Sequence, residues 1–100
     1  PTVIYPNCTS KLNHVSNNKN ELAIRITPLK KLGLLIDAIQ SPIVSTSANV
    51  SGEPFPRKFE DIDKRIIDSV DIIFNFDTKS SGYPSKIIRI DEFGALQYIR

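Results

Sequence analysis

The chain has 100 residues, of which 40% are hydrophobic and 24% are charged, and its formal net charge is +2. This length allows one domain at most, and this composition is typical of a globular chain rather than a disordered one. The weak positive charge falls short of the basic stripe of a dedicated nucleic-acid binder, and neither a membrane-length apolar run nor a signal-peptide pattern is present. Cys8 is the single cysteine, so no internal disulfide can form, and we expect a cytoplasmic protein. Because no apolar run is of membrane length, we also expect that the protein is not bound to a membrane.

The first quarter of the chain predicts two strands separated by a polar loop. Residues 2–5 are β-branched and aromatic, whereas residues 7–20 are rich in Asn, Ser and Lys and predict an exposed loop or a weak hairpin. Residues 22–26 alternate, which places their three aliphatic side chains on one face and Arg25 on the other.

Two helices are predicted by their apolar spacing. Thr27 is placed to cap the first helix and Pro28 to be its first residue, and the helix ends at Ser41 and Pro42. Leu32, Leu35, Ile36 and Ile39 fall on one of its faces. The second helix is predicted over residues 58–68, with Phe59, Ile62 and Ile66 on its apolar face.

Further strands are predicted at residues 42–44, 70–76, 85–90 and 95–100, with a long turn over 77–84 and a hairpin connection over 91–94. The resulting order of strands and helices predicts an α/β domain, a twisted mixed β-sheet with both helices packed on it. We expect the core of this domain to bury Leu32, Leu35, Ile36, Ile62, Ile66, Ile73 and Ile87.

Small and hydroxyl-bearing residues fill the stretch from Ser45 to Gly52, directly after the strand predicted at 42–44. Such side chains let a ligand approach the backbone, and their hydroxyl and amide groups offer hydrogen bonds without charge. Polar groups at a strand end are also where open α/β sheets place their ligands. The alternative is an ordinary turn that binds nothing, since the same residues dominate turns.

Other kinds of site find little support in the sequence. The only histidine, His14, lies in the polar loop without a marked nucleophile, and one Cys and one His give no metal-ligand spacing. Asp61, Asp63 and Asp68 are interpreted as solvated charges on or beside the second helix. The isolated arginines suit a small anionic ligand but specify no reaction; they are Arg25, Arg89 and Arg100.

The stretch from Pro42 to Pro54, PIVSTSANVSGEP, resembles the signature loop of the YrdC-like family, the threonylcarbamoyl-AMP synthases. The neighbouring segments agree in order and distance. Arg25 with the Thr-Pro helix start, the YPSKII segment at 83–88, the strand at 95–100 and the opening residues 1–6 all resemble family motifs. The resemblance therefore covers nearly the whole chain.

This resemblance implies that L-threonine, bicarbonate and ATP are joined to threonylcarbamoyl-AMP with release of pyrophosphate, for the threonylcarbamoyladenosine modification of tRNA. ATP would be a substrate accompanied by Mg²⁺, no protein-bound metal is implied, and some family members bind RNA, so tRNA or double-stranded RNA is a further expected partner. No catalytic residue is assigned. The positions implied to bind ATP are Ser47, Asn49 and Arg100, and those implied to bind L-threonine are Arg25, Ser45 and Ser85.

Several departures from the family pattern modify this expectation. The family's Lys-x-Arg motif has no counterpart, and Glu21, Phe55 and Lys86 replace a threonine, a serine and a threonine. Residues 1–100 are thus interpreted as the C-terminal part of a YrdC-like domain, which we expect to be inactive alone and either self-associated or marginally stable. The alternative is a non-catalytic module of the same fold that binds nucleotide or RNA.

Overall fold

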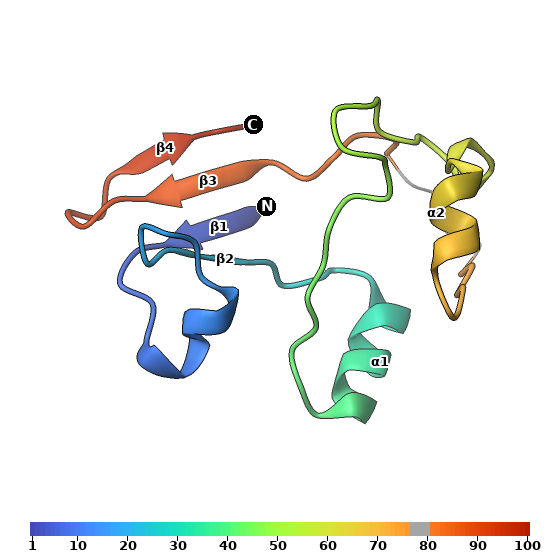
Figure 1. Cartoon of the computed structure of the whole chain (residues 1–100). Helices are drawn as coiled ribbons and strands as arrows, with labels where there is room; N and C mark the ends of the chain where they lie inside the picture. The colour runs from blue at the N-terminus through green and yellow to red at the C-terminus, as the bar shows by residue number, and fades with distance from the viewer. Residues whose placement is uncertain (77–80) are drawn as a thin grey trace. The chain divides into compact units, whose positions relative to one another are not determined.

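The computed structural model describes residues 1–76 and 81–100 and divides the chain into two compact units. The first unit comprises Pro1–Pro28 with Ser85–Arg100, and the second comprises Leu29–Pro84. Each unit is described by itself below (Figure 1). Part of the turn predicted over 77–84 lies outside the described residues.

The first unit is a mixed four-stranded sheet with the order β2-β1-β3-β4 (Figure 1). Its strands are β1 (Thr2–Tyr5), β2 (Leu22–Ile24), β3 (Ile87–Ile90) and β4 (Leu96–Tyr98). β1 pairs antiparallel with β2 and parallel with β3, and β3 pairs antiparallel with β4. The predicted mixed sheet is therefore confirmed, although three of its four strands are shorter than the sequence pattern indicated.

The register gives the sheet one wholly apolar face. Val3 pairs with Ile24 and Ile88, and Ile88 pairs with Tyr98. Because side chains alternate along a strand, Tyr5, Leu22, Ile90 and Leu96 belong to the same face. Leu96 and Tyr98 are 62% and 72% exposed, so this face is only partly covered. An apolar face of this kind supports the expected self-association, which stays a prediction.

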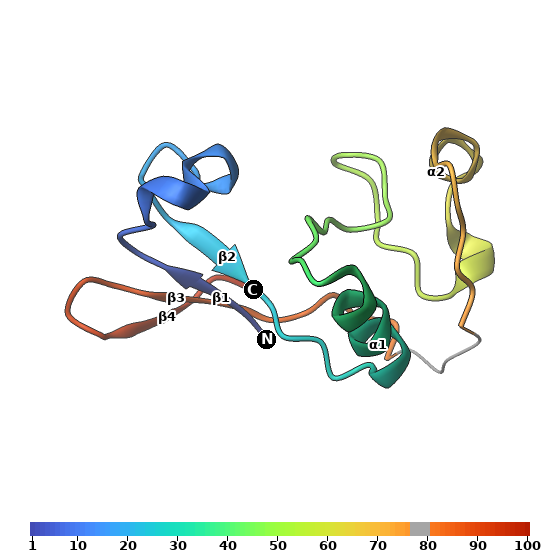
Figure 2. The ribbon, with the colours of Figure 1, turned by 90° about the horizontal axis from the view of Figure 1, so that it is seen from below.

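Polar side chains close both hairpins of this sheet. The β1–β2 connection contains a short 3₁₀ helix, η1 (Ser10–Val15) (Figure 2). In the same connection, Asn17 Oδ1 accepts from the backbone amides of Lys19 and Glu21. In the β3–β4 turn, Asp91 Oδ1 accepts from the amides of Phe93 and Ala95, and Gly94 adopts a φ of 81°. Both connections predicted from turn residues are confirmed.

The second unit contains α1 (Lys30–Ile39), the 3₁₀ helix η2 (Phe59–Asp61) and α2 (Lys64–Ser69). The N-cap of α1 is Leu29, without a side-chain cap, so the prediction of Thr27 as the cap is wrong. Pro28 disfavours helical backbone at the residue before it, and the helix begins two residues after it. Gln40 ends α1 in the left-handed region with a φ of 58°, which confirms the predicted end before Ser41.

Three predicted elements need correction. Residues 42–44 and 70–76 are not strands, and the helix predicted over 58–68 is divided into η2 and α2. A β-branched, apolar run gives a strand only where a neighbouring strand supplies backbone hydrogen bonds, and within the described residues these two runs have no such partner. Ile62, at φ −68° and ψ 126°, takes extended backbone and separates the two helical pieces.

The predicted core residues are less buried than expected. No side chain among residues 1–76 and 81–100 is fully buried, and Ile73 is 45% exposed. The other predicted core residues are half-buried: Leu32, Leu35, Ile36, Ile62, Ile66 and Ile87. Packing of the helices on the sheet stays a prediction. Among the described residues, no helix is long and apolar enough to cross a membrane.

Candidate functional site

The loop from Ser45 to Gly52 lies in the second unit and ends in a tight turn. The amide of Glu53 donates to the carbonyl oxygen of Val50 at 2.9 Å, and Gly52 adopts a φ of 83°. A glycine reaches this backbone conformation without strain, which explains its place in the turn. Ser45 and Ser47 lie in the part of the loop without regular secondary structure, and both residues are exposed.

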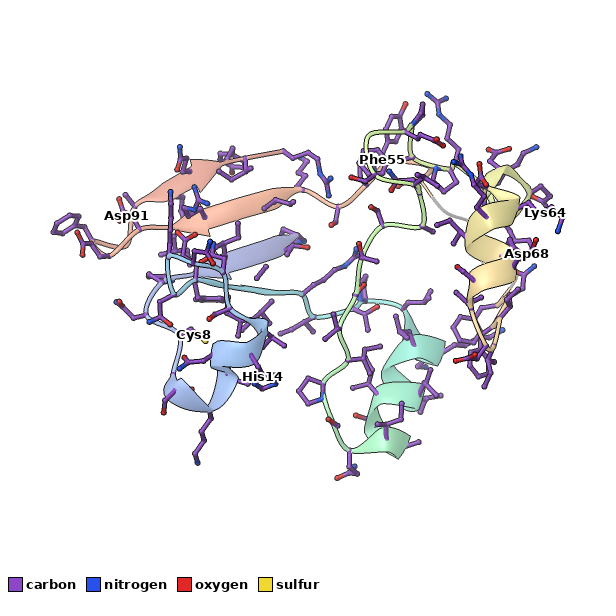
Figure 3. All side chains as sticks on the ribbon, in the orientation of Figure 1. Cys8, His14, Phe55, Lys64, Asp68 and Asp91 are labelled. Carbon is purple, nitrogen blue, oxygen red and sulfur yellow. The ribbon has the colours of Figure 1, made fainter. Side chains whose placement is uncertain are left out.

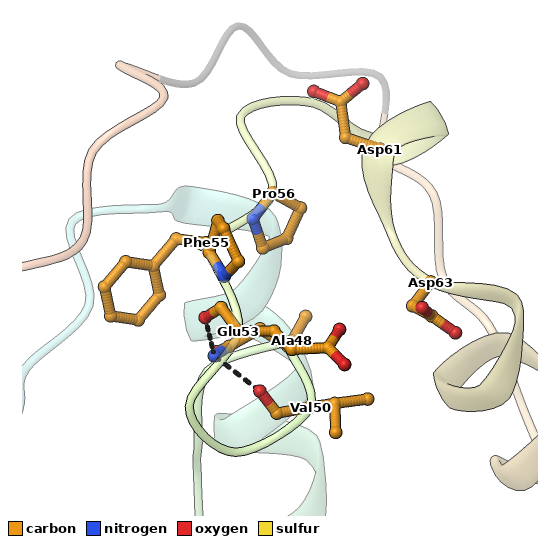
Figure 4. A pocket seen from close by; sticks show the side chains of 9 residues that line it. Ala48, Val50, Glu53, Phe55, Pro56, Asp61 and Asp63 are labelled. Atoms are coloured by element: carbon orange, nitrogen blue, oxygen red, sulfur yellow. Dashed lines mark hydrogen bonds between the residues drawn. The ribbon is translucent and has the colours of Figure 1, made fainter.

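Asn49 is the most tightly held polar residue of this loop. Its Nδ2 donates to the carbonyl oxygens of Val50 at 3.1 Å and Glu53 at 2.9 Å, as the dashed lines in Figure 4 mark. Because both partners are acceptors, the nitrogen and not the oxygen of the amide must face them. Asn49 Oδ1 is left buried without a hydrogen-bond partner in the described part of the chain. A buried acceptor of this kind favours a ligand that donates a hydrogen bond.

A pocket of about 260 Å³ lies beside Asn49 (Figure 4). Pro54, Phe55 and Pro56 contribute apolar atoms to its lining, whereas Glu53, Asp61 and Asp63 contribute carboxylates. No cationic side chain is among its described lining residues. An apolar pocket with an uncharged acceptor and negative neighbours suits a neutral, donor-bearing group better than a triphosphate.

Arg65 connects this pocket to the start of α2. Its Nη2 donates to Glu53 Oε1 at 2.8 Å and to Asp63 Oδ2 at 2.8 Å, and its Nε donates to Asp63 Oδ1 at 2.9 Å. Asp63 also caps α2 by accepting from the Arg65 amide at 2.8 Å. These hydrogen bonds favour the charged carboxylate and lower the pKa of Asp63 from 3.8 to about 2, while the pKa of Arg65 is raised.

This arrangement predicts an acid-sensitive cap on α2. Since the pKa of Asp63 is lower in the folded state, its stabilising contribution is fully present above about pH 4 and is lost as the pH falls through 2. We expect an NMR titration of the Asp63 carboxyl to show a midpoint near 2, and Arg65→Gln to move that midpoint back toward 3.8. We call the hydrogen bonds of Arg65 to Asp63 and Glu53 the Arg65 clamp. A midpoint near 4 in the unmodified protein would contradict this clamp.

Three predicted ligand positions lie in the sheet unit. Arg25 follows β2 directly and is exposed, and it takes part in none of the ion pairs found among the described residues. Ser85 precedes β3, and its hydroxyl lies 3.1 Å from that of Thr2. Arg100 donates from Nε and Nη2 to the Ser85 carbonyl oxygen, both at 3.3 Å. The structure thus brings Ser85 and Arg100 together, although the family resemblance assigns them to different ligands.

Glu21 and Arg89 form an ion pair on the polar side of the sheet. Arg89 Nε lies 3.1 Å from Glu21 Oε1, and the two side chains are 30% and 14% exposed. Asn17 Nδ2 donates to Glu21 Oε2 at 2.8 Å. Glu21 stands where the family resemblance expects a threonine, so Arg89 balances the charge that this replacement introduces. This contact accounts for Arg89, which the sequence alone linked to an anionic ligand.

The remaining candidates have local roles. Phe55 lines the pocket, and the carbonyl oxygen of Lys86 accepts from the Thr2 amide at 2.7 Å. Cys8 and His14 lie on the β1–β2 connection (Figure 3). Across the described residues, no group of three or more His, Cys, Asp or Glu side chains could hold a metal ion.

Sequence reasoning missed two features of these sites, the Arg65 clamp and the Thr2 hydroxyl. Asp63 directly before an apolar helical run was a recognisable N-cap signal, but it was interpreted as a solvated charge. Nothing in the local pattern indicated that Thr2 would meet Ser85, because 83 positions separate them along the chain.

Comparison with known proteins identifies a family whose profile covers the whole chain and relatives that cover most of it. The profile of the Sua5/YciO/YrdC family, described as "Telomere recombination", matches residues 1–100. Threonylcarbamoyl-AMP synthase of Stenotrophomonas maltophilia is 34% identical over 73 residues, which cover 73% of this chain and 39% of that protein. The proteins of the same name from Xylella fastidiosa and Vibrio parahaemolyticus are each 30% identical over 86 residues, which cover 86% of this chain and 46% of theirs.

The chain thus spans less than half the length of these curated relatives. No solved structure matches it significantly.

Proposed function

Because this chain belongs to the Sua5/YciO/YrdC family, we propose that the full-length protein is a threonylcarbamoyl-AMP synthase. The amine of L-threonine and bicarbonate give a carbamate with loss of water. A carbamate oxygen then displaces pyrophosphate from the α-phosphorus of ATP. The product is threonylcarbamoyl-AMP, the intermediate for threonylcarbamoyladenosine in tRNA, and the enzyme acts in the cytoplasm with ATP presented as its Mg²⁺ complex.

The observation that carries this proposal is the unpartnered acceptor Asn49 Oδ1 beside the pocket. Phosphate oxygens cannot donate to it when ionised, whereas the adenine amino group and the ribose hydroxyls can. The apolar wall at Phe55 suits the face of a base. We therefore assign Asn49 to the nucleoside part of ATP, with Ser47 on the same loop as its neighbour.

The positions proposed to bind L-threonine lie mainly in the sheet unit. Among the described residues, Arg25 forms no ion pair, and a guanidinium suits a carboxylate through two parallel hydrogen bonds. Ser85 offers a hydroxyl for the amine or the carboxylate, and Ser45 provides a further hydroxyl from the loop. Arg100, assigned to ATP, donates to the Ser85 carbonyl oxygen.

A second candidate is a non-catalytic module of this fold that binds nucleotide or RNA. The observation in its favour is the charge of the pocket. Its described lining contains three carboxylates, two of them paired with Arg65, and no cationic side chain that could neutralise a triphosphate. Phosphoryl-transfer sites normally place Arg, Lys or Mg²⁺ at the phosphates. The family's Lys-x-Arg motif would supply such cations.

A pyrophosphate-release assay separates the two candidates. We expect the full-length protein to release pyrophosphate from ATP only when L-threonine and bicarbonate are both present, because the carbamate is the nucleophile. The 100-residue chain alone should show no turnover, since it has no Lys-x-Arg segment. Nucleotide binding by the full-length protein without threonine-dependent release would favour the non-catalytic module instead.

A further inference from the structure

The hydroxyl of Ser85 faces a second hydroxyl from the opposite end of the chain. Thr2 Oγ1 lies 3.1 Å from Ser85 Oγ, both residues are half-buried, and either oxygen can donate. Thr2 is the first residue of β1, and its amide donates to the Lys86 carbonyl oxygen at 2.7 Å. The parallel pairing of β1 and β3 thus places one hydroxyl directly against the other.

The backbone of Ser85 is already fixed by other contacts. Its carbonyl oxygen accepts from Arg100, and the amide of Ile87 donates to the Arg100 carbonyl oxygen at 2.7 Å. What remains free is rotation of the serine side chain, which has three staggered positions. Thr2 is β-branched and stiff at χ1, so its hydroxyl is a fixed reference that selects one of those positions.

We propose that Thr2 is a positioning residue for L-threonine binding, which holds the Ser85 hydroxyl in the orientation that meets the substrate. This inference rests on the proposed function, because it takes Ser85 as a contact of the substrate. Thr2 itself does not touch the substrate. Its hydrogen bond satisfies one side of the Ser85 hydroxyl and leaves the other side for the ligand.

Isothermal titration of the full-length protein with L-threonine, and separately with ATP, tests this role. Loss of one neutral hydrogen bond predicts that Thr2→Val weakens threonine binding about two- to tenfold and leaves ATP binding unchanged. Thr2→Ser should restore most of the threonine binding, because it keeps the hydroxyl but not the stiff, β-branched side chain. Thr9→Val is the matched control, since Thr9 is exposed and its side chain makes no cap hydrogen bond.

A double-mutant cycle distinguishes positioning from a general structural effect. If Thr2 acts through Ser85, Thr2→Val should have no further effect on threonine binding in a Ser85→Ala background. An equal loss in both backgrounds, or unchanged binding by Thr2→Val alone, would overturn the inference while the proposed function stands. If the unmodified protein binds no threonine, both the inference on Thr2 and the proposed function fail. Should Thr2→Val not fold, Thr2→Cys supplies a weaker hydrogen bond of similar size and should give a smaller loss.

Discussion

Replacing Ile88 with Asp should lower the free energy of unfolding of the full-length protein by about 2–4 kcal/mol. Ile88 lies on the inner strand β3, where it pairs with Val3 on one side and Tyr98 on the other. The substitution removes an aliphatic side chain from the apolar face and places a carboxylate there without a partner. Urea unfolding followed by circular dichroism measures the change.

Gln97→Asp is the matched control, since it introduces the same charge on the same sheet. Gln97 is exposed and pairs with Arg89, so it lies on the opposite face from Ile88. A carboxylate beside a guanidinium there should change the unfolding free energy by less than about 1 kcal/mol. Equal destabilisation by the two variants would show that the apolar face does not stabilise the sheet.

Local patterns were sufficient to predict the four strands of the mixed sheet. Residues 2–5 and 87–90 combine β-branched side chains with clear turn residues, and Asp91 and Gly94 define their own hairpin. The runs at 42–44 and 70–76 have the same composition and yet form no strand. Composition reports how well a segment suits a sheet, whereas a strand also depends on a partner that the local sequence does not encode.

The candidate site shows the same difference between local features, which a sequence pattern can indicate, and contacts that depend on the fold. The small residues of the loop at 45–52 are a local property, and the sequence indicated them. The Arg65 clamp, the Glu21–Arg89 pair and the Thr2–Ser85 contact join residues that are distant along the chain or that were individually unremarkable. Such contacts depend on strand register and helix position, which become known only with the fold.

Arg25→Ala should weaken L-threonine binding to the full-length protein by roughly 1.5–3 kcal/mol and leave ATP binding nearly unchanged. The expected loss is that of a charge-assisted hydrogen bond to the threonine carboxylate. Ser47→Ala should do the reverse, because Ser47 is assigned to ATP together with Asn49. The alternative for Arg25, a surface pair with a nearby carboxylate, would be worth only about 0–1 kcal/mol, and no such pair is found among the described residues.

Titration calorimetry of both variants with each ligand decides between these roles. Lys19→Ala removes the same charge from the exposed β1–β2 connection and should affect neither ligand by more than a few tenths of a kcal/mol. Arg25→Lys keeps the charge but not the planar fork, so threonine binding should fall between that of the unmodified protein and that of Arg25→Ala. If both Arg25→Ala and Ser47→Ala weakened both ligands equally, the separate assignment of threonine and ATP would be wrong. Arg25 and Ser47 would then act on one shared ligand or through the stability of the fold.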